Sequence, residues 1–111
     1  MEGSEDEIDE QEPREITLII EPEAESELDE AYRYYEHKKP GLGMEFLEEV
    51  ESGIQSILHH PEMHAIVHKQ IRRCVLHRFP YGLFYIHNES SASIISCFHA
   101  SRDPKQWQRR T

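Results

Sequence analysis

The sequence predicts an α+β domain in which two helices form a hairpin on one face of a small antiparallel sheet. A short strand-like run is followed by two segments with helical periodicity, and three runs rich in β-branched and aromatic residues come after them. In chain order these segments read β-α-α-β-β-β. The length of 111 residues fits one domain.

The first half of the chain predicts one strand and two helices. Residues 16–20 are mostly β-branched and predict a strand, and Pro22 begins a helix at a position where its missing N–H does no harm. That helix should end before Pro40, the Gly41-Leu42-Gly43 turn should reverse the chain, and the second helix should end before Pro61. Apolar stripes at helical spacing predict the core: Leu28, Ala31, Tyr32 and Tyr35 in the first helix, and Phe46, Leu47, Val50, Ile54, Ile57 and Leu58 in the second. The acids expected on the solvated face of the second helix are Glu45, Glu48, Glu49 and Glu51.

The second half predicts three strands, at 71–79, 83–87 and 92–99. A Pro80-x-Gly82 turn separates the first two, and a turn at 88–91 separates the last two. Alternation along the first of these strands predicts two sets of side chains on opposite faces: Arg73, Val75, His77 and Phe79 on one, and Arg72, Cys74, Leu76 and Arg78 on the other. Because the helices can cover one face only, some of these arginines should lie on an exposed surface.

The net charge of −10 is distributed unevenly along the chain. Residues 1–15 carry −7, residues 16–68 carry −9, and the residues from 69 onward carry +6. Residues 1–14 contain a single aliphatic side chain, Ile8, so residues 1–15 are expected to be a disordered acidic tail ahead of a domain at 16–111. The basic half of that domain should attract an acidic partner or a phosphate backbone.

Other features predict a cytoplasmic protein without cofactor or metal. The chain contains no apolar run of the roughly 18 residues that span a bilayer, and its amino terminus is acidic. Cys74 and Cys97 lie among apolar neighbours and are interpreted as buried thiols in a reducing compartment. The four-residue spacing of His60, His64 and His68 suits zinc or nickel on a helix, but Pro61 interrupts it and favours a solvated loop.

Five motifs follow one another in the order found in a known family. They are Ala31-Tyr32-x-x-Tyr35, Pro40-Gly41-Leu42-Gly43-x-x-Phe46-x-x-x-Val50, Ile54-x-x-Ile57-x-x-x-Pro61, the arginine-bearing run from Arg72 to Tyr85, and the segment from Ile94 to Trp107. Together they resemble the RelE/ParE superfamily of toxins from bacterial type II toxin-antitoxin modules, and its ParE-like branch in particular, over residues 16 to about 109. The resemblance implies the same helical hairpin on an antiparallel sheet.

The resemblance also implies a set of site residues: Arg72, Arg73, Arg78, His99, Arg102 and Trp107. In ribonuclease members, basic side chains on the open face of the sheet hold mRNA on the ribosome, and Arg78 and Arg102 match their positions. Trp107 falls near the place of an acid-base tyrosine, yet an indole cannot exchange a proton usefully. His99 could be a base or a structural residue closing a strand, and Arg78 and Arg102 could pair with helix acids.

ParE-like members are understood to poison DNA gyrase by binding, without chemistry. The first expectation is therefore a gyrase-poisoning toxin, and the alternatives are a ribosome-dependent mRNA endoribonuclease and a degenerate, non-toxic antitoxin-binding module. The implied partner is a cognate antitoxin covering the groove between the helices and the sheet. The acidic tail, which the resemblance does not cover, could screen the basic surface or act as a solubilising segment.

Overall fold

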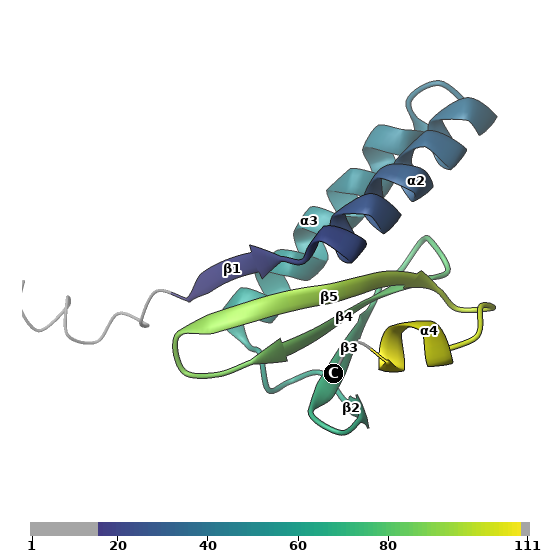
Figure 1. The fold of residues 1–111 in the computed structure, drawn as a ribbon. Helices are drawn as coiled ribbons and strands as arrows, with labels where there is room; N and C mark the ends of the chain where they lie inside the picture. Colours follow the sequence, from purple (N-terminus) through teal and green to yellow (C-terminus); the bar gives the residue numbers. More distant parts are fainter. Residues whose placement is uncertain (1–15, 110–111) are drawn as a thin grey trace, which may run out of the picture.

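The computed structural model describes residues 16–109, which form one sheet with helices on both faces (Figure 1). The elements are β1 (Thr17–Ile20), α2 (Pro22–Lys38), α3 (Leu42–His59), β2 (Ile66–His68), β3 (Ile71–Val75), β4 (Tyr81–His87), β5 (Ser91–His99) and α4 (Lys105–Gln108). The strands lie in the order β1-β5-β4-β3-β2. The predicted α+β class and helical hairpin are confirmed. β2 and α4 are missing from the predicted order, because segments of three and four residues are too short to show a period.

The two faces of the sheet are covered differently. The α2–α3 hairpin packs on one face, where its apolar stripe meets Cys74, Leu83, Tyr85 and Ile94 of the strands. On the opposite face, Trp107 of α4 packs on a smaller cluster formed by Ile71, Phe84, Ile95 and Phe98. Because α4 has four residues, it covers only part of this second face and leaves the rest open (Figure 1).

The sheet is mixed, and not purely antiparallel as predicted. β1 lies parallel to β5, with Thr17 opposite Ser91 and Ile20 opposite Ile94. The other neighbouring strands run antiparallel. Beyond Ile94, helix α2 takes over the outer edge of β5, where a carboxylate oxygen of Glu27 accepts the backbone N–H of Cys97 at 3.0 Å. The edge of a central strand is thereby closed by a side chain where the partner strand ends.

The hairpin between the helices is built as the prolines and glycines predict. Pro22 lies in the first turn of α2, and Gly41 adopts a left-handed conformation with φ 92° just before α3. The Glu36 carboxylate accepts the N–H of Gly41 at 3.0 Å and that of Gly43 at 3.0 Å. These bonds satisfy donors at the start of α3 that have no partner within the helix.

β3 ends at Val75, so the predicted strand at 71–79 is too long. From Leu76 the alternation fails, because Leu76 and Phe79 are both buried in the core under the helices. Leu76 donates its backbone N–H to the carbonyl of Tyr81 at 3.0 Å, which closes a loop over residues 76–80. The alternation holds for Arg73 and Val75, which are exposed on the open face.

The predicted turn at Pro80-x-Gly82 is also misplaced, since Gly82 lies inside β4 opposite Val75. A Cβ atom at Gly82 would lie 3.0 Å from Cγ of Arg73 and 3.2 Å from its Cδ. The glycine therefore leaves room for the aliphatic stem of Arg73 to lie across the sheet. Its role is to position a side chain and not to turn the chain.

Both cysteines are free and buried, as predicted. Burial, and to a lesser extent the Glu27 carboxylate, raises the pKa of the Cys97 thiol to about 12, and burial also raises the pKa of Cys74. Both groups are therefore neutral, unreactive core side chains at physiological pH.

Candidate functional site

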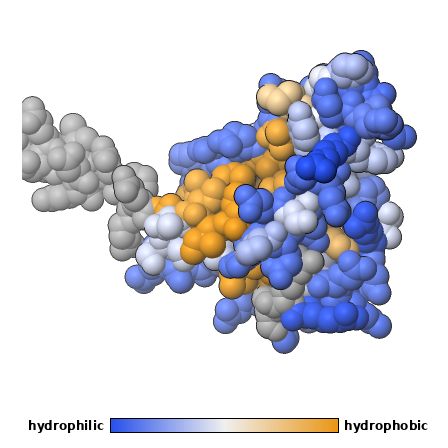
Figure 2. Space-filling view, turned by 45° about the horizontal axis from the view of Figure 1, so that its top comes forward, coloured by the Kyte–Doolittle hydropathy of each residue, from blue (hydrophilic) through white to orange (hydrophobic). Residues whose placement is uncertain are grey.

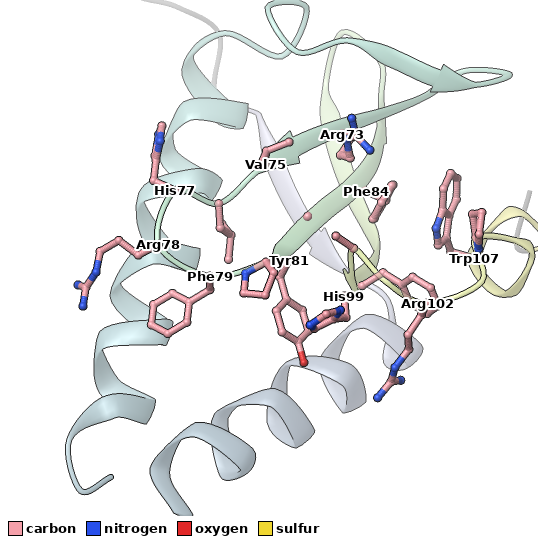
Figure 3. A pocket seen from close by; sticks show the side chains of 16 residues that line it. Arg73, Val75, His77, Arg78, Phe79, Tyr81, Phe84, His99, Arg102 and Trp107 are labelled. Carbon is pink, nitrogen blue, oxygen red and sulfur yellow. The ribbon is translucent and has the colours of Figure 1, made fainter. Parts of the chain in front are cut away.

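A groove lies on the open face of the sheet, between the 76–80 loop and α4 (Figure 3). Its volume is about 650 Å³. We call it the basic groove. It is lined by Arg73, Val75, Leu76, His77, Arg78, Phe79, Pro80, Tyr81, Gly82, Phe84, Phe98, His99, Ala100, Arg102, Pro104 and Trp107.

The charge of the basic groove is of one sign. Three arginines and two histidines line it, and none of the lining residues is an aspartate or a glutamate. The protein as a whole has 22 acidic and 12 basic side chains. A groove free of carboxylates in so acidic a chain has a positive local potential, which attracts anions.

Arg73 and Arg102 are the freest cations of the basic groove. Both are exposed, and within residues 16–109 neither forms an ion pair with a carboxylate. Arg73 comes from β3 and Arg102 from the loop after β5, so the fold brings together two residues far apart in the sequence. Exposed guanidinium groups of this kind bind phosphates and carboxylates through two parallel hydrogen bonds.

His99 closes β5 between these arginines. Its Nδ1 accepts the backbone N–H of Ser101 at 3.0 Å, so the proton of the neutral ring is on Nε2. The ring meets Tyr81 edge-on, with centroids 5.1 Å apart. Burial raises the pKa of Tyr81, partly offset by Arg102, so this phenol is a neutral donor and not a base. Tyr81 was not among the predicted site residues, because its position opposite His99 depends on the register of β4 and β5.

Arg78 lies at the rim and is already paired. Its guanidinium bonds Glu45 of α3 at 2.5 Å, and Figure 3 shows it pointing away from Arg73 and Arg102. Beside this pair, Glu49 accepts the backbone N–H of His77 at 3.0 Å and that of Arg78 at 3.2 Å. Glu45 and Glu49, expected on the solvated face of the helix, instead fasten the 76–80 loop to α3.

Arg72 does not line the basic groove, although it adjoins Arg73 in the sequence. It points to the other side of β3 and donates to the carbonyls of His64 at 2.7 Å and Glu62 at 3.1 Å. The His64 ring in turn bonds Ser56 Oγ at 2.9 Å, and burial, with a smaller effect from Arg72, lowers the pKa of His64. Arg72 is thus engaged in holding the loop between α3 and β2.

Trp107 belongs to the far end of the basic groove, where α4 meets the sheet. The indole is only 4% exposed and is stacked on Phe84. Its main contact is therefore with the protein itself. Of the six predicted site residues, the basic groove contains Arg73, Arg78, His99, Arg102 and Trp107, while Arg72 lies outside it.

His60 and His64 lie in a loop after α3, as the interruption by Pro61 predicts, but His68 ends β2 and His64 is partly buried, so the segment is not the fully solvated loop that was expected. Within residues 16–109, no cluster of three or more histidines, cysteines or acids is placed to hold a metal ion. In the same range, no helix is both long and apolar enough to span a bilayer.

A second groove of about 630 Å³ lies between α2 and the end of β5. We call it the helix-side groove. Four residues line both grooves and so form the wall between them: Pro80, Tyr81, His99 and Arg102. Figure 2 shows hydrophobic side chains gathered over β1 and the helices behind it, where Ile19 and Ile20 are 41% and 36% exposed.

Comparisons with known proteins agree with this fold. Residues 18–104 match the family model described as the ParE toxin of the type II toxin-antitoxin system parDE. A solved chain described as the chromosomal ParDE TA system from P. aeruginosa superimposes with a TM-score of 0.68 and 14% sequence identity, over 78% of this chain and 97% of that one. No curated protein matches the sequence significantly.

Proposed function

The chain belongs to the ParE toxin family of type II toxin-antitoxin systems, and from this premise we propose that it arrests growth by binding DNA gyrase and not by cleaving RNA. The toxin role follows from the family match over residues 18–104. What we propose beyond the toxin role is the molecular target. As a toxin that acts on gyrase, the protein works in the cytoplasm.

The observation that supports binding over cleavage is the burial of Trp107. If the protein were a ribonuclease, Trp107 would fall near the position of an acid-base tyrosine. An indole does not exchange protons, however, and this one is buried and stacked on Phe84. His99 is the remaining candidate base, and its Nδ1 already accepts a hydrogen bond from Ser101. A binding function requires neither residue to transfer a proton.

One observation favours RNA cleavage as the second candidate. Arg73, His99 and Arg102 line a groove without carboxylates, which suits a phosphate backbone. The two targets are distinguished by purified assays. A gyrase poison inhibits supercoiling and accumulates cleaved DNA, whereas an interferase leaves gyrase unaffected and cuts mRNA on translating ribosomes.

The test of the site compares three variants during induction without antitoxin. Arg102→Ala should relieve growth arrest and leave the melting temperature unchanged, because its guanidinium makes no ion pair within residues 16–109. Arg78→Ala should relieve growth arrest less, since the Arg78 guanidinium is already paired with the Glu45 carboxylate. Arg33→Ala on α2, which removes an exposed arginine paired with Asp29, is the matched control and should remain toxic. Undiminished toxicity of Arg102→Ala would remove this residue from the site, and no toxicity of the parent protein would support the degenerate module.

The partner of the toxin is a cognate antitoxin, and we place its binding segment over the helix-side groove and the apolar area beside it. Apolar side chains of the antitoxin would pack on the exposed Ile19 and Ile20, and acidic side chains of the antitoxin would be attracted by the basic half of this chain. Ile19→Glu should then weaken co-purification of the antitoxin, while Thr17→Glu on the same strand should weaken it less. Equal retention of the antitoxin by wild type and Ile19→Glu would exclude this surface.

A further inference from the structure

The acidic segment 1–15 lies outside the family match at 18–104 and carries −7. We propose that the basic groove is a binding site for polyanions and that its occupant in the free toxin is this segment of the same chain. The inference adds a regulation to the proposed target site, and in that sense it rests on the proposed function.

The first support is charge complementarity. Arg73 and Arg102 are exposed, have no carboxylate partner within residues 16–109, and line a groove without a single acid. Segment 1–15 contains eight acids and one arginine. Its Ile8 is an aliphatic residue that suits the apolar floor of the groove at Val75 and Phe84.

The second support is repulsion from the alternative surface. α2 contains six acids and two bases, and α3 contains four acids and no lysine or arginine. A segment of charge −7 is therefore repelled from the helical face of the sheet. The open face, where the basic groove lies, is the face that attracts it.

The third support is reach. The segment joins the domain at β1, where Thr17 lies opposite Ser91 at the start of β5. Arg73 is opposite Phe84, which is opposite Ser96, so the near end of the groove is about five residues further along and three strand spacings across from β1, roughly 22 Å away. A flexible chain of fifteen residues has a mean end-to-end distance of about 20–23 Å, and like charges extend it.

Tethering determines the expected strength. A short flexible tether gives an effective concentration of the order of 1 mM. If the untethered segment bound the groove with a dissociation constant of about 0.1 mM, the tethered segment would weaken the binding of a competing anion roughly 10-fold. Exposed charges are screened beyond about 8 Å at physiological ionic strength, so the competition must depend on salt.

The test measures contact and competition on the purified full-length protein, so it does not depend on which target the toxin attacks. A spin label is attached at Ser4→Cys; Cys74 and Cys97 are 4% and 1% exposed and do not compete for it. Paramagnetic broadening of backbone amides is recorded at low salt and at about 1 M salt, where the Debye length is about 3 Å. The control, called the uncharged-tail protein, carries the same label and a tail of zero net charge in which only Arg14 and Glu15 stay charged. Its substitutions are Glu2→Gln, Glu5→Gln, Asp6→Asn, Glu7→Gln, Asp9→Asn, Glu10→Gln and Glu12→Gln.

The proposal expects broadening at Gly82, Ala100 and Arg102, little at Arg33 on α2, and loss of the effect in high salt and in the control. In parallel, a fluorescent oligoglutamate peptide should bind the uncharged-tail protein roughly 10-fold more tightly than wild type, and Arg73→Gln with Arg102→Gln should abolish the difference. Broadening that is uniform, confined to the vicinity of β1, unchanged in the control, or transferred between molecules in a mixed sample would overturn the proposal. Equal peptide affinities of wild type and uncharged-tail protein would overturn it as well. If the broadening and the peptide affinities came out as expected but the protein did not inhibit gyrase, the proposed target would be wrong and the binding of the tail to the groove would stand.

Discussion

The Trp107 indole stacks on the Phe84 ring, with centroids 4.2 Å apart and planes inclined by 26°. One ring comes from a four-residue helix near the end of the chain and the other from the middle of β4. Since α4 is too short to be stable alone, this contact is what holds the carboxy-terminal segment on the sheet. It also completes the cluster that covers part of the open face.

Trp107→Ala should therefore destabilise the fold. Truncating a buried tryptophan costs about 3–5 kcal/mol, which corresponds to a fall in melting temperature of roughly 10–20 °C. Trp107→Phe keeps a stacking ring and should lose much less, and Gln106→Ala on the same helix is the exposed control. Thermal melting of the three variants separates packing from target binding. A Trp107→Ala protein that melts like wild type but is not toxic would show that the indole acts on the target.

Glu49 should contribute to stability through the loop at 76–80. Its carboxylate accepts two backbone N–H groups, and hydrogen bonds to a charged group contribute about 1.5–3 kcal/mol where they are shielded. Because the site is half exposed, Glu49→Ala should cost about 1–2 kcal/mol, and Glu48→Ala, an exposed neighbour, should change stability by less than about 0.5 kcal/mol. Denaturant unfolding measures both. Equal midpoints for the two variants would mean that the loop holds without the carboxylate.

His64 should make stability depend on pH in one direction. Burial and the nearby Arg72 lower its pKa below the ordinary value of 6.5, so the folded protein favours the neutral ring. The unfolded chain then binds more protons near and below pH 6.5, and the contribution of His64 is present above that pH and lost as the pH falls towards the lowered folded pKa.

The check is the difference in melting temperature between wild type and His64→Gln, measured across pH 8 to 5 so that the other histidines cancel. The wild-type advantage should shrink as the pH falls. An advantage that grows on acidification would show that the charged ring is the favoured form.

Lys69 is the single non-glycine residue with positive φ among residues 16–109, at 53°. The left-handed conformation is unfavourable for a residue with a Cβ atom, whereas glycine adopts it freely. Lys69→Gly should therefore stabilise the turn between β2 and β3 by about 0.5–1 kcal/mol, while Gln70→Gly, next to it, should destabilise. Chemical denaturation of the pair provides the measurement, and a loss of stability in Lys69→Gly would show that its side chain makes a contact of greater value.

Local signals predicted the helices well and the sheet less well. Pro22 and Gly41 act within their own segments, so their positions could be read directly. Gly82 could not, because the reason for a glycine there is the stem of Arg73 on the neighbouring strand, which only the register reveals.

The site shows the same division between local and long-range information. Alternation correctly separated Arg72 from Arg73, but it does not tell which of them meets the carbonyls of Glu62 and His64. The resemblance placed Trp107 among the site residues, and its burial depends on Phe84 lying beneath it. Glu45 and Glu49 follow the helical period of a solvated face, but they bind the 76–80 loop, which comes from the other half of the chain.

The parallel pairing of β1 with β5 has a consequence for biosynthesis. The first strand of the domain finds its partner in the last one, with Thr17 opposite Ser91 and Glu27 of α2 bonded to Cys97. During translation, the helical hairpin can form early, but it has no complete sheet to pack on until β5 has left the ribosome. The wall of Pro80, Tyr81, His99 and Arg102 likewise requires the end of β5 and the loop after it. The surface that both grooves form therefore cannot exist on a nascent chain that lacks the segment from β5 to α4.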